Sequence, residues 1–267
     1  PFVKKEIDID ETSPLVNLAY DVNDDLMIYA SYSEGFKSGG FSQRVFPPIV
    51  PPFTAPAGTP DIDLIPTFQP EFVQAFELGF KHMGAGGRLR LNGAVFNTEY
   101  DDLQIQVFTS VAPVTKNAAS AEVNGFELEL QWLPGSDWLI ELGVGYVDAE
   151  YNSIDATTTF VDKSNDLERI SKWTWNLGVS KDMSLAGGRL APRLDWSYRS
   201  KFFNDTFNTP QIAQRAGYDL ANLSVAWQDP GENWRITLAV NNLTDEKYLI
   251  TGIIGDAFQS YETLYNR

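Results

Sequence analysis

The acidic and amide side chains of Asp21, Asn23 and Asp25 have the spacing of the first three ligands in a calcium-binding loop. Such a loop also needs a glycine at its sixth position and a glutamate at its twelfth, and this chain has Leu26 and Tyr32 there. A polar turn is therefore the favoured interpretation of this segment.

Three features of the sequence could indicate a catalytic site, and none of them has the full set of residues that the chemistry needs. His82 is the only histidine, and with no cysteine in the chain neither a zinc site nor a nucleophile–base pair is expected. Asp101 and Asp102 could act as paired carboxylates, but they follow Tyr100 at the end of a predicted strand, where the solvated start of a loop is favoured. The glycine-rich segment 84–87 lacks the following helix that a phosphate-binding loop needs. We therefore expect no catalytic activity, no metal site and no cofactor.

The charge balance argues against one class of partner. The 267 residues include 36 acidic and 20 basic side chains, for a formal net charge of −16. A protein that binds nucleic acid needs a basic face to meet phosphates, so no nucleic-acid partner is expected. The absence of cysteine rules out disulfides. The chain has no run of apolar residues long enough for a transmembrane helix.

Turn signals recur about every 50 residues along the chain. Each short turn is flanked by two extended segments of roughly ten residues, and longer irregular stretches separate these pairs. Alternation of short turns and long loops predicts an antiparallel up-and-down sheet with unequal ends. Propeller blades are an alternative for this period, but they use shorter and more numerous strands.

Apolar and polar residues alternate along these segments, as expected for β-strands. In the segment 138–146, the even-numbered residues Trp138, Leu142 and Tyr146 would lie on one face of the strand, and the odd-numbered Glu141 on the other. We call these two sets of alternate positions the apolar and the polar parity. About ten strands are predicted, near 14–22, 26–34, 71–82, 88–100, 121–132, 138–150, 171–181, 189–200, 216–228 and 233–242. The charged side chains of the polar parity are expected to line an aqueous lumen; they are Glu127, Glu129, Glu141, Arg193, Asp195, Arg199 and Arg235.

On the apolar face of the predicted strands, aromatic residues lie near the short-turn end and near the long-loop end. Indole and phenol rings favour the membrane–water boundary, so two such belts indicate the wall of an outer-membrane barrel. A soluble β-sandwich or lipocalin-like barrel also alternates, but soluble strands typically have about five or six residues. The predicted interface girdle consists of Trp132, Trp138, Tyr146, Trp173, Trp175, Trp196, Tyr198, Trp227 and Trp234.

Four segments resemble those of TonB-dependent outer-membrane receptors, in the order and spacing of that family. They are Gly35-Phe36-Lys37-Ser38-Gly39-Gly40-Phe41, Pro70-Glu71 followed by Phe76-Glu77-Leu78-Gly79-Phe80-Lys81, Asn117 followed by Gly125-Phe126-Glu127-Leu128-Glu129, and Asn241-Asn242-Leu243-Thr244-Asp245-Glu246-Lys247-Tyr248. The resemblance covers nearly the whole chain. Phe76 stands where the family usually has tyrosine, and the chain stops at Arg267 instead of an aromatic closing residue.

The resemblance implies an all-β, antiparallel up-and-down transmembrane barrel of twenty-two strands. Residues 1–267 would form its C-terminal portion, and the N-terminal plug domain and signal peptide would lie outside this chain. The implied function is TonB-coupled uptake of a scarce ligand, most often a ferric siderophore, across the outer membrane of a Gram-negative bacterium. The implied partners are outer-membrane lipid, the plug, the TonB complex acting through the plug, and an extracellular ligand such as a metal chelate. A passive porin and a soluble β-sheet ligand-binding module are the alternatives.

The resemblance also implies that ligand binds at the long loops, which are Phe36–Gln69, Asp101–Ser120, Asn152–Leu167 and Lys201–Arg215. Within them the candidate ligand contacts are Phe36, Lys37, Phe202, Phe203 and Phe207. The aromatic rings could stack on a ligand or pack the loop itself. The lumen charges could be simply solvated or could hold the plug. Pro192 is a local misfit, because proline removes a hydrogen-bond donor from a predicted strand.

Overall fold

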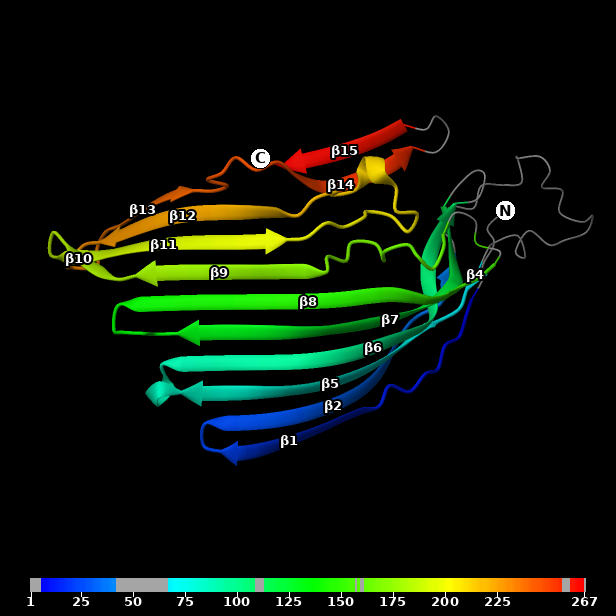
Figure 1. Cartoon of the computed structure of the whole chain (residues 1–267), viewed down its shortest axis with the longest axis horizontal. Helices are drawn as coiled ribbons and strands as arrows, with labels where there is room; N and C mark the ends of the chain where they lie inside the picture. The colour runs from blue at the N-terminus through cyan, green and yellow to red at the C-terminus, as the bar shows by residue number, and fades with distance from the viewer. Residues whose placement is uncertain are drawn as a thin grey trace, which may run out of the picture.

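The structure is a computed structural model, and it describes residues 6–41, 67–108, 113–156, 158, 161–255 and 260–266. Its main element is one antiparallel sheet of 11 strands. Ten lie side by side in the order β1-β2-β5-β6-β7-β8-β9-β11-β12-β13, and β10 pairs with β11 (Figure 1). The strands are β1 (Leu15–Asn23), β2 (Leu26–Lys37), β5 (Glu71–Gly84), β6 (Leu89–Phe108), β7 (Pro113–Trp132), β8 (Trp138–Ile154), β9 (Trp173–Lys181), β10 (Met183–Leu185), β11 (Gly188–Arg199), β12 (Tyr218–Gln228) and β13 (Arg235–Val240).

Each of the ten predicted strands has a counterpart in this sheet, so the predicted all-β, antiparallel up-and-down fold is confirmed. Short turns join the strands at one end of the sheet, and the longer connections lie at the other end (Figure 1). The sheet is open, with β1 and β13 at its two edges. In the described part of the chain, no helix has the length and hydropathy needed to cross a bilayer.

The predicted loop Asp101–Ser120 is wrong, because strands occupy most of it. β6 and β7 remain paired as far as Phe108 and Pro113. The register shifts after Tyr100, where Asp102 has a φ of 52°. A bulge of this kind inserts an extra residue into the strand. After it, the even- and odd-numbered side chains exchange faces, so the apolar–polar alternation seen before Tyr100 does not continue unchanged.

The outer part of this extension has its own apolar pattern. Ile105 and Val107 of β6 are buried against Ala119 and Ala121 of β7 and Tyr151 of β8. These residues form the hydrophobic cluster of the described chain, and it lies beyond the ends of the shorter neighbouring strands. The long-loop end of the sheet is therefore the part with a packed interior.

Two further strands form near the C-terminal end, where the sequence indicated an irregular stretch near 250–260 and no strand was predicted. β14 (Tyr248–Gly255) and β15 (Ser260–Asn266) make a separate antiparallel hairpin. It lies beside η3 (Pro210–Ile212), a short helix in the β11–β12 connection (Figure 1). Two further short strands, β3 (Gly40–Phe41) and β4 (Thr67–Phe68), pair near the end of β2, and η2 (Ala85–Gly87) forms the β5–β6 turn.

Pro192 lies at a gap in the ladder, which explains why β11 tolerates it. It pairs with Val225 on the β12 side. On the other side, the β9 ladder ends at Arg193 paired with Ser180, and the β10 ladder begins at Leu190 paired with Met183. The missing N–H therefore falls where no neighbour would accept from it.

The β10–β11 turn shows why the sequence around 183–188 predicts a sharp reversal. Leu185 and Gly188 pair directly, which leaves Ala186 and Gly187 as a two-residue loop. Both have positive φ, 51° and 78°. This is the conformation of a type I′ turn, and its twist matches that of the flanking strands.

The β12–β13 turn is held by Asp229, whose carboxylate accepts backbone hydrogen bonds from Trp234 (2.5 Å) and Gly231 (3.1 Å). The Trp234 amide, with help from the other donors, lowers the pKa of Asp229 below its ordinary value. A lowered pKa in the folded state means that the carboxylate stabilises the turn above about pH 4 and that this contribution is lost as pH falls further.

We therefore expect Asp229→Asn to weaken the turn at neutral pH and to have a smaller effect at pH 2–3. Hydrogen exchange of the Trp234 amide, followed against pH in the full-length protein, measures this directly. A difference between wild type and variant that stays constant from pH 7 to pH 2 would contradict the assignment. Asp24→Asn, in the β1–β2 turn, is a matched control.

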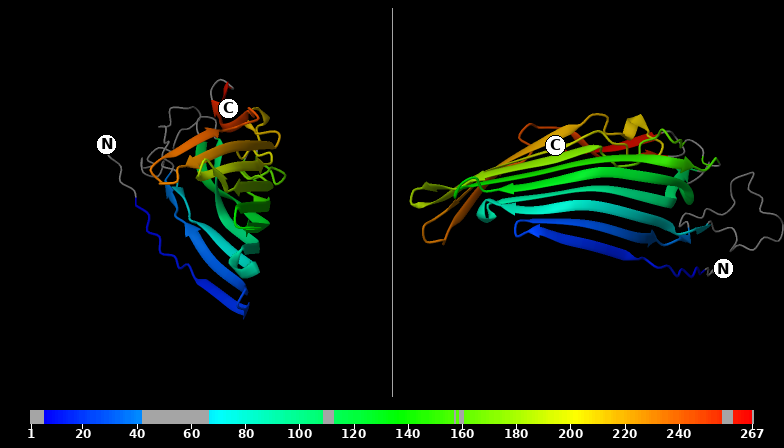
Figure 2. Two further views of the ribbon diagram at one scale, coloured as in Figure 1. Left: turned by 90° about the vertical axis from the view of Figure 1, so that its left-hand side faces the viewer. Right: turned by 60° about the horizontal axis from the view of Figure 1, so that its bottom comes forward.

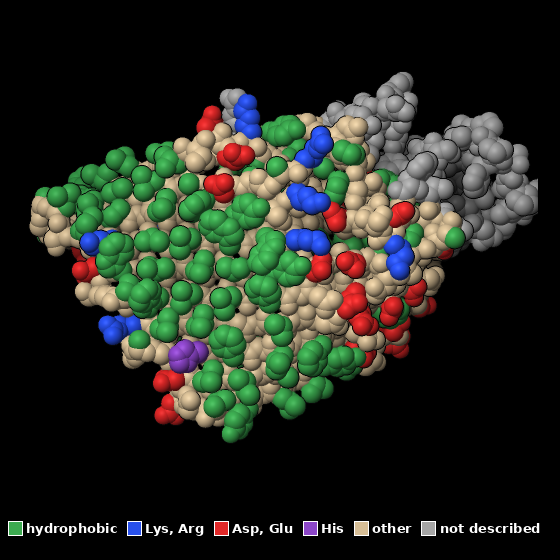
Figure 3. Space-filling model, in the orientation of Figure 1, with side chains coloured by type: hydrophobic (Ala, Val, Ile, Leu, Met, Phe, Trp, Pro, Cys, Tyr) green, Lys and Arg blue, Asp and Glu red, His purple; other side chains and the backbone are tan. Residues whose placement is uncertain are grey.

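The strand register sorts side chains onto two faces. On one face, Leu142 of β8 pairs with Leu130 and Leu177 of its two neighbours. On the other, Glu141 lies at the same level as Asp195 of β11. The sheet is curved like a trough (Figure 2). Figure 3 looks at its convex face, which is covered largely by apolar side chains.

The apolar residues on the convex face are not covered by a second layer of protein. Trp173 is 44% exposed and Ile236 is 56% exposed. A soluble sandwich would enclose such side chains between two sheets. The arrangement is instead that of a barrel wall whose apolar side chains point outward.

Candidate functional site

The concave face carries a charged cluster on neighbouring strands. Arg193 of β11 donates to Glu141 of β8 (Nη1–Oε2 2.8 Å) and to Asp195 of its own strand (Nη2–Oδ1 2.6 Å). Both carboxylates stand at positions that pair with Gly178 of β9. A Cβ on Gly178 would lie 2.7 Å from Arg193 Nη2, so glycine leaves room for the guanidinium to cross β9. Two carboxylates for one guanidinium leave the cluster with negative charge.

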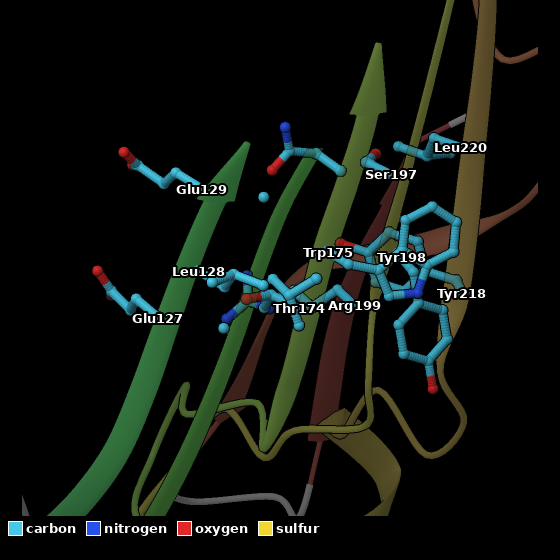
Figure 4. A pocket seen from close by; sticks show the side chains of 14 residues that line it. Glu127, Leu128, Glu129, Thr174, Trp175, Ser197, Tyr198, Arg199, Tyr218 and Leu220 are labelled. Carbon is cyan, nitrogen blue, oxygen red and sulfur yellow. The ribbon is translucent and has the colours of Figure 1, made fainter. Parts of the chain in front are cut away.

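A hollow of about 440 Å³ lies on the same face, over β7, β8, β9, β11 and β12. Its floor is made by small residues, including Gly143, Gly145 and Thr174. Glu127 and Glu129 stand on the β7 side of it (Figure 4). Among the described residues, Asn92 donates to Glu129 (3.3 Å) and no cation pairs with either glutamate. The hollow is therefore a polar, negatively charged surface.

Arg199 connects this wall to the loops beyond it. Its Nε donates to Ser171 Oγ (2.8 Å), and its Nη2 donates to the backbone oxygen of Arg169 (2.8 Å). Its guanidinium carbon lies 4.3 Å from the centre of the Phe202 ring. Thus one side chain holds both the β8–β9 and the β11–β12 connections. Arg235, by contrast, is exposed on the edge strand β13, near the short-turn end.

The two connections are tied to each other by reciprocal hydrogen bonds. Asp166 N donates to Asn208 Oδ1 (2.6 Å), and Asn208 Nδ2 donates to Asp166 O (2.8 Å). Asn165 donates to the backbone oxygen of Thr206, whose hydroxyl donates to Gln106 O of β6. We call this assembly, residues 161–172 and 200–217, the loop layer. It is ordered by specific contacts and lies at the long-loop end of the sheet.

The predicted ligand contacts in the loop layer differ in accessibility. Phe202 is 5% exposed, so it packs the loop and its ring is covered. Phe203 and Phe207 are half-buried, and Lys201 lies over the Phe203 ring at 5.7 Å. A role in ligand contact stays a prediction for all three.

The other two predicted contacts are at the end of β2. Phe36 is 37% exposed and lies opposite Phe72 of β5. Lys37 is largely exposed, and its Nζ is 3.8 Å from Glu71 Oε2. They lie on a different part of the rim from Phe202, Phe203 and Phe207, and their role in ligand contact also stays a prediction.

A compact network fixes the backbone at the two described ends of the β2–β5 connection, residues 37–38 and 69–71. Asn117 Oδ1 accepts from Gln69 N (2.6 Å), and its Nδ2 donates to Gln69 O (2.9 Å), Pro70 O (3.2 Å) and Asp102 O (2.8 Å). Gln104 Nε2 donates to Ser38 O and Gln69 O, both at 3.0 Å. We call Asn117 and Gln104 the loop clamp.

Glu71 completes the clamp from the other side. Glu71 is 8% exposed, and its Oε2 accepts a hydrogen bond from the backbone N–H of Gln104 at 2.8 Å. The sequence signalled Asn117 and Glu71 only as motif positions and did not signal Gln104 at all. The alternation of Gln104 and Gln106 with apolar residues was the available sign that this segment is a strand.

The predicted girdle residues lie at the two ends of the convex face. Tyr146 packs against Trp173 (ring centroids 4.7 Å apart), and Trp175 packs against Trp196 (5.1 Å) and Tyr198 (6.1 Å). Trp196 donates to Asp219 at 3.0 Å, so a polar tip is satisfied at this end. The other members, Trp132, Trp138, Trp227 and Trp234, lie beside the short turns.

The β1–β2 turn has the polar-turn geometry that the sequence favoured over a calcium loop, because Asn23 Oδ1 accepts from the backbone amide of Asp25 (2.9 Å). Within the described ranges, no group of three or more acidic or histidine side chains is arranged to hold a metal ion.

An open, curved sheet with an apolar convex face and a polar concave face defines the wall of an outer-membrane β-barrel. The family model described as "TonB dependent receptor-like, beta-barrel" matches residues 3–243. The chain belongs to this family, whose members are Gram-negative outer-membrane receptors, and the family resemblance predicted from the motifs is confirmed.

Individual relatives agree with this assignment. A probable TonB-dependent siderophore receptor of Acinetobacter baumannii, PiuA, is 27% identical over 192 residues, which is 67% of this chain and 24% of that protein. The pesticin receptor of Yersinia pestis is 24% identical over 91% of this chain and 32% of its own length. The chain thus spans about a quarter to a third of these relatives.

Solved structures share the fold. The ferric yersiniabactin uptake receptor FyuA from Yersinia pestis superposes with a TM-score of 0.74 at 24% identity, over 94% of this chain and 35% of that one. The copper transporter OprC superposes with a TM-score of 0.66 at 16% identity, over 95% of this chain and 37% of that one.

Proposed function

We propose that residues 1–267 form the C-terminal portion of a receptor barrel and that the complete receptor imports a ferric siderophore across the outer membrane by TonB-coupled transport. The loop layer is the observation that carries this proposal. It presents an ordered polar surface at the long-loop end, next to the concave wall, where a ligand would be captured before it enters the barrel. The relatives named as siderophore or ferric yersiniabactin receptors support the choice of ligand class.

Energy coupling requires a movable element inside the barrel, and the concave wall has the charge to hold one. Glu127 and Glu129 have no cationic partner among the described residues, and the Glu141–Arg193–Asp195 cluster keeps one negative charge in excess. We infer that the plug domain, outside this chain, presents basic side chains to these carboxylates. Such charge pairs can be made and broken reversibly because the wall is wet.

Ligand contact is assigned to the accessible aromatic rings of the loop layer. Phe203 and Phe207 keep part of their surface open, whereas Phe202 is already covered by Arg199. A planar aromatic ring on the ligand would stack on them with a free energy of about 0.5–1.5 kcal/mol each. The convex girdle remains assigned to the two lipid–water boundaries.

Growth of a receptor-deletion strain that carries the full-length gene tests the function. We expect growth on a defined ferric siderophore as sole iron source, and loss of growth when tonB is also deleted. Uptake that continues without TonB would indicate the passive porin instead. Growth equal to the deletion strain on every ferric chelate, with uptake of another metal chelate retained, would reject the siderophore.

Phe207→Ala should raise the Kd for the ferric siderophore by about two- to tenfold while leaving the amount of receptor in the outer membrane unchanged. Binding to purified full-length receptor, followed by quenching of intrinsic fluorescence, measures this effect. Phe202→Ala is the comparison variant, because its buried ring packs the loop: it should lower the protection of residues 200–217 from proteolysis. Unchanged affinity in Phe207→Ala would remove this residue from the ligand site.

A further inference from the structure

The β14–β15 hairpin lies against η3, the short helix of the β11–β12 connection (Figure 1). Ile212 of η3 is 1% exposed and Leu249 of β14 is 2% exposed, so both side chains are covered. A Cβ at Gly252 would lie 2.4 Å from the Cβ of Ile212, which is closer than two non-bonded carbon atoms can approach. In this arrangement only glycine fits at position 252.

Hydrogen bonds join the hairpin to both connections of the loop layer. The backbone N–H of Leu249 donates to Gln214 Oε1 (2.9 Å), in the β11–β12 connection. Thr251 Oγ1 accepts from Arg169 Nη2 (3.2 Å), in the β8–β9 connection. The backbone N–H of Arg169 in turn donates to the backbone oxygen of Phe203 (2.7 Å). Arg169 therefore links the hairpin to the backbone of an aromatic residue that is assigned to ligand contact.

At its other end, the hairpin is fixed to the barrel wall by a closed turn. Asn242 Oδ1 accepts from Glu246 N, and its Nδ2 donates to Glu246 O, both at 2.9 Å. The backbone N–H of Asn242 donates to Asn222 Oδ1 of β12 (2.8 Å). Beyond this turn, the Tyr248 ring stacks on the Tyr218 ring of β12, with centroids 4.8 Å apart and an interplanar angle of 9°. Because the hairpin is held by the wall as well as by the loops, it fixes the loops relative to the wall.

We propose that the β14–β15 hairpin positions Phe203 and Phe207 for ligand capture, with Gly252 and Thr251 as the positioning residues. The proposal rests on the proposed function of the loop layer as the surface that captures the ligand. Both phenylalanines precede η3 in the β11–β12 connection, so a hairpin that holds η3 also restricts their movement. A loop that is ordered before binding loses less conformational entropy when the ligand arrives, and it therefore binds more tightly.

Gly252→Ala in the full-length receptor tests the contact with η3. The added methyl group must displace the hairpin, so the Gln214 amide, which donates to Phe202 O (3.0 Å), should exchange with solvent about tenfold faster. Gly135→Ala, in the β7–β8 turn, is the matched control, because the same methyl group there meets no atom of a non-neighbouring residue within 4 Å. Unchanged protection of the Gln214 amide in Gly252→Ala would overturn the proposal.

Thr251→Val is a milder variant, which keeps the shape of the side chain and removes only its hydroxyl group. Without the acceptor for Arg169, the Arg169 amide that donates to Phe203 O should exchange about threefold faster. This variant carries the test if Gly252→Ala does not fold, and an Arg169 amide that exchanges at the wild-type rate would then overturn the proposal.

Ligand affinity separates positioning from a general loss of stability. The probe is the ferric siderophore that supports growth of the deletion strain carrying the full-length gene. Gly252→Ala should raise its Kd by about two- to tenfold, the same range as Phe207→Ala. In a background that carries both Phe203→Ala and Phe207→Ala, the change at Gly252 should alter Kd by less than about twofold, because the rings that it displaces are already absent. Equal effects in the two backgrounds would overturn the proposal.

Failure of the proposed function gives a different result. If no ferric siderophore supports growth, the growth test rejects that ligand, and the affinity test uses the metal chelate whose uptake the receptor retains. Exchange of the Gln214 and Arg169 amides needs no ligand, so it decides in either case whether the hairpin holds the two connections.

Discussion

Leu142→Arg is expected to destabilise the folded barrel in lipid by about 2–4 kcal/mol. Leu142 lies on β8, four residues from Trp138 and four from Tyr146, so it is midway between the two aromatic ends of the convex face. It pairs with Leu130 and Leu177, which leaves no polar side chain at its level on that face. An arginine there would have to extend toward a boundary or thin the bilayer locally.

Equilibrium unfolding in urea, with the full-length receptor folded into vesicles, measures this cost. Gln131→Arg is the matched control, because it adds the same side chain to an exposed position of the concave face, opposite Glu141. Glu141 is less suitable: an arginine there would stand beside Arg193, whose Nη1 is 2.8 Å from the Glu141 carboxylate. Equal losses of stability in the two variants would reject the assignment of the convex face to lipid.

The strands could be predicted because a barrel wall has lipid on one side and water on the other. Successive residues of each strand therefore alternate between apolar and polar types. Trp138, Leu142 and Tyr146 on one parity and Glu141 on the other were enough to place β8 and to orient it. The loops beyond the membrane are solvated on both sides, so the same signal weakens there. The bulge after Tyr100 then shifts the phase, which is why the paired extension of β6 and β7 was predicted as a loop.

The site was less predictable, because its geometry depends on contacts between distant segments. The sequence marked Phe202, Phe203 and Phe207 alike as aromatic loop residues. In the structure Phe202 is covered, with Arg199 over its ring and its backbone paired with Gln214, whereas Phe203 and Phe207 are half-buried. Likewise Pro192 was a misfit in the pattern, and only the pairing of its two neighbours shows that its missing N–H costs nothing.

Asn117→Ala is expected to release the loop clamp while leaving the barrel wall folded. The side chain makes four hydrogen bonds, all to backbone atoms of Gln69, Pro70 and Asp102. Removing it leaves these groups to water or unpaired, which should cost about 1–3 kcal/mol locally. Because each 1.4 kcal/mol is tenfold in an equilibrium constant, the Gln69 amide should exchange with solvent about tenfold faster or more.

Hydrogen exchange of the full-length receptor resolves this effect from a general loss of stability. Asn97→Ala is the matched control: Asn97 is also an asparagine of the long-loop half, but its side chain donates to the side chains of Glu122 and Asn124. It should leave the Gln69 amide protected. If Asn117→Ala also left that amide protected, the backbone at 69–71 would be held by Gln104 and Glu71 without Asn117. If the two variants instead exposed strands β5 to β8 equally, Asn117 would be part of the wall's own stability, because a clamp acts only on the segment it holds.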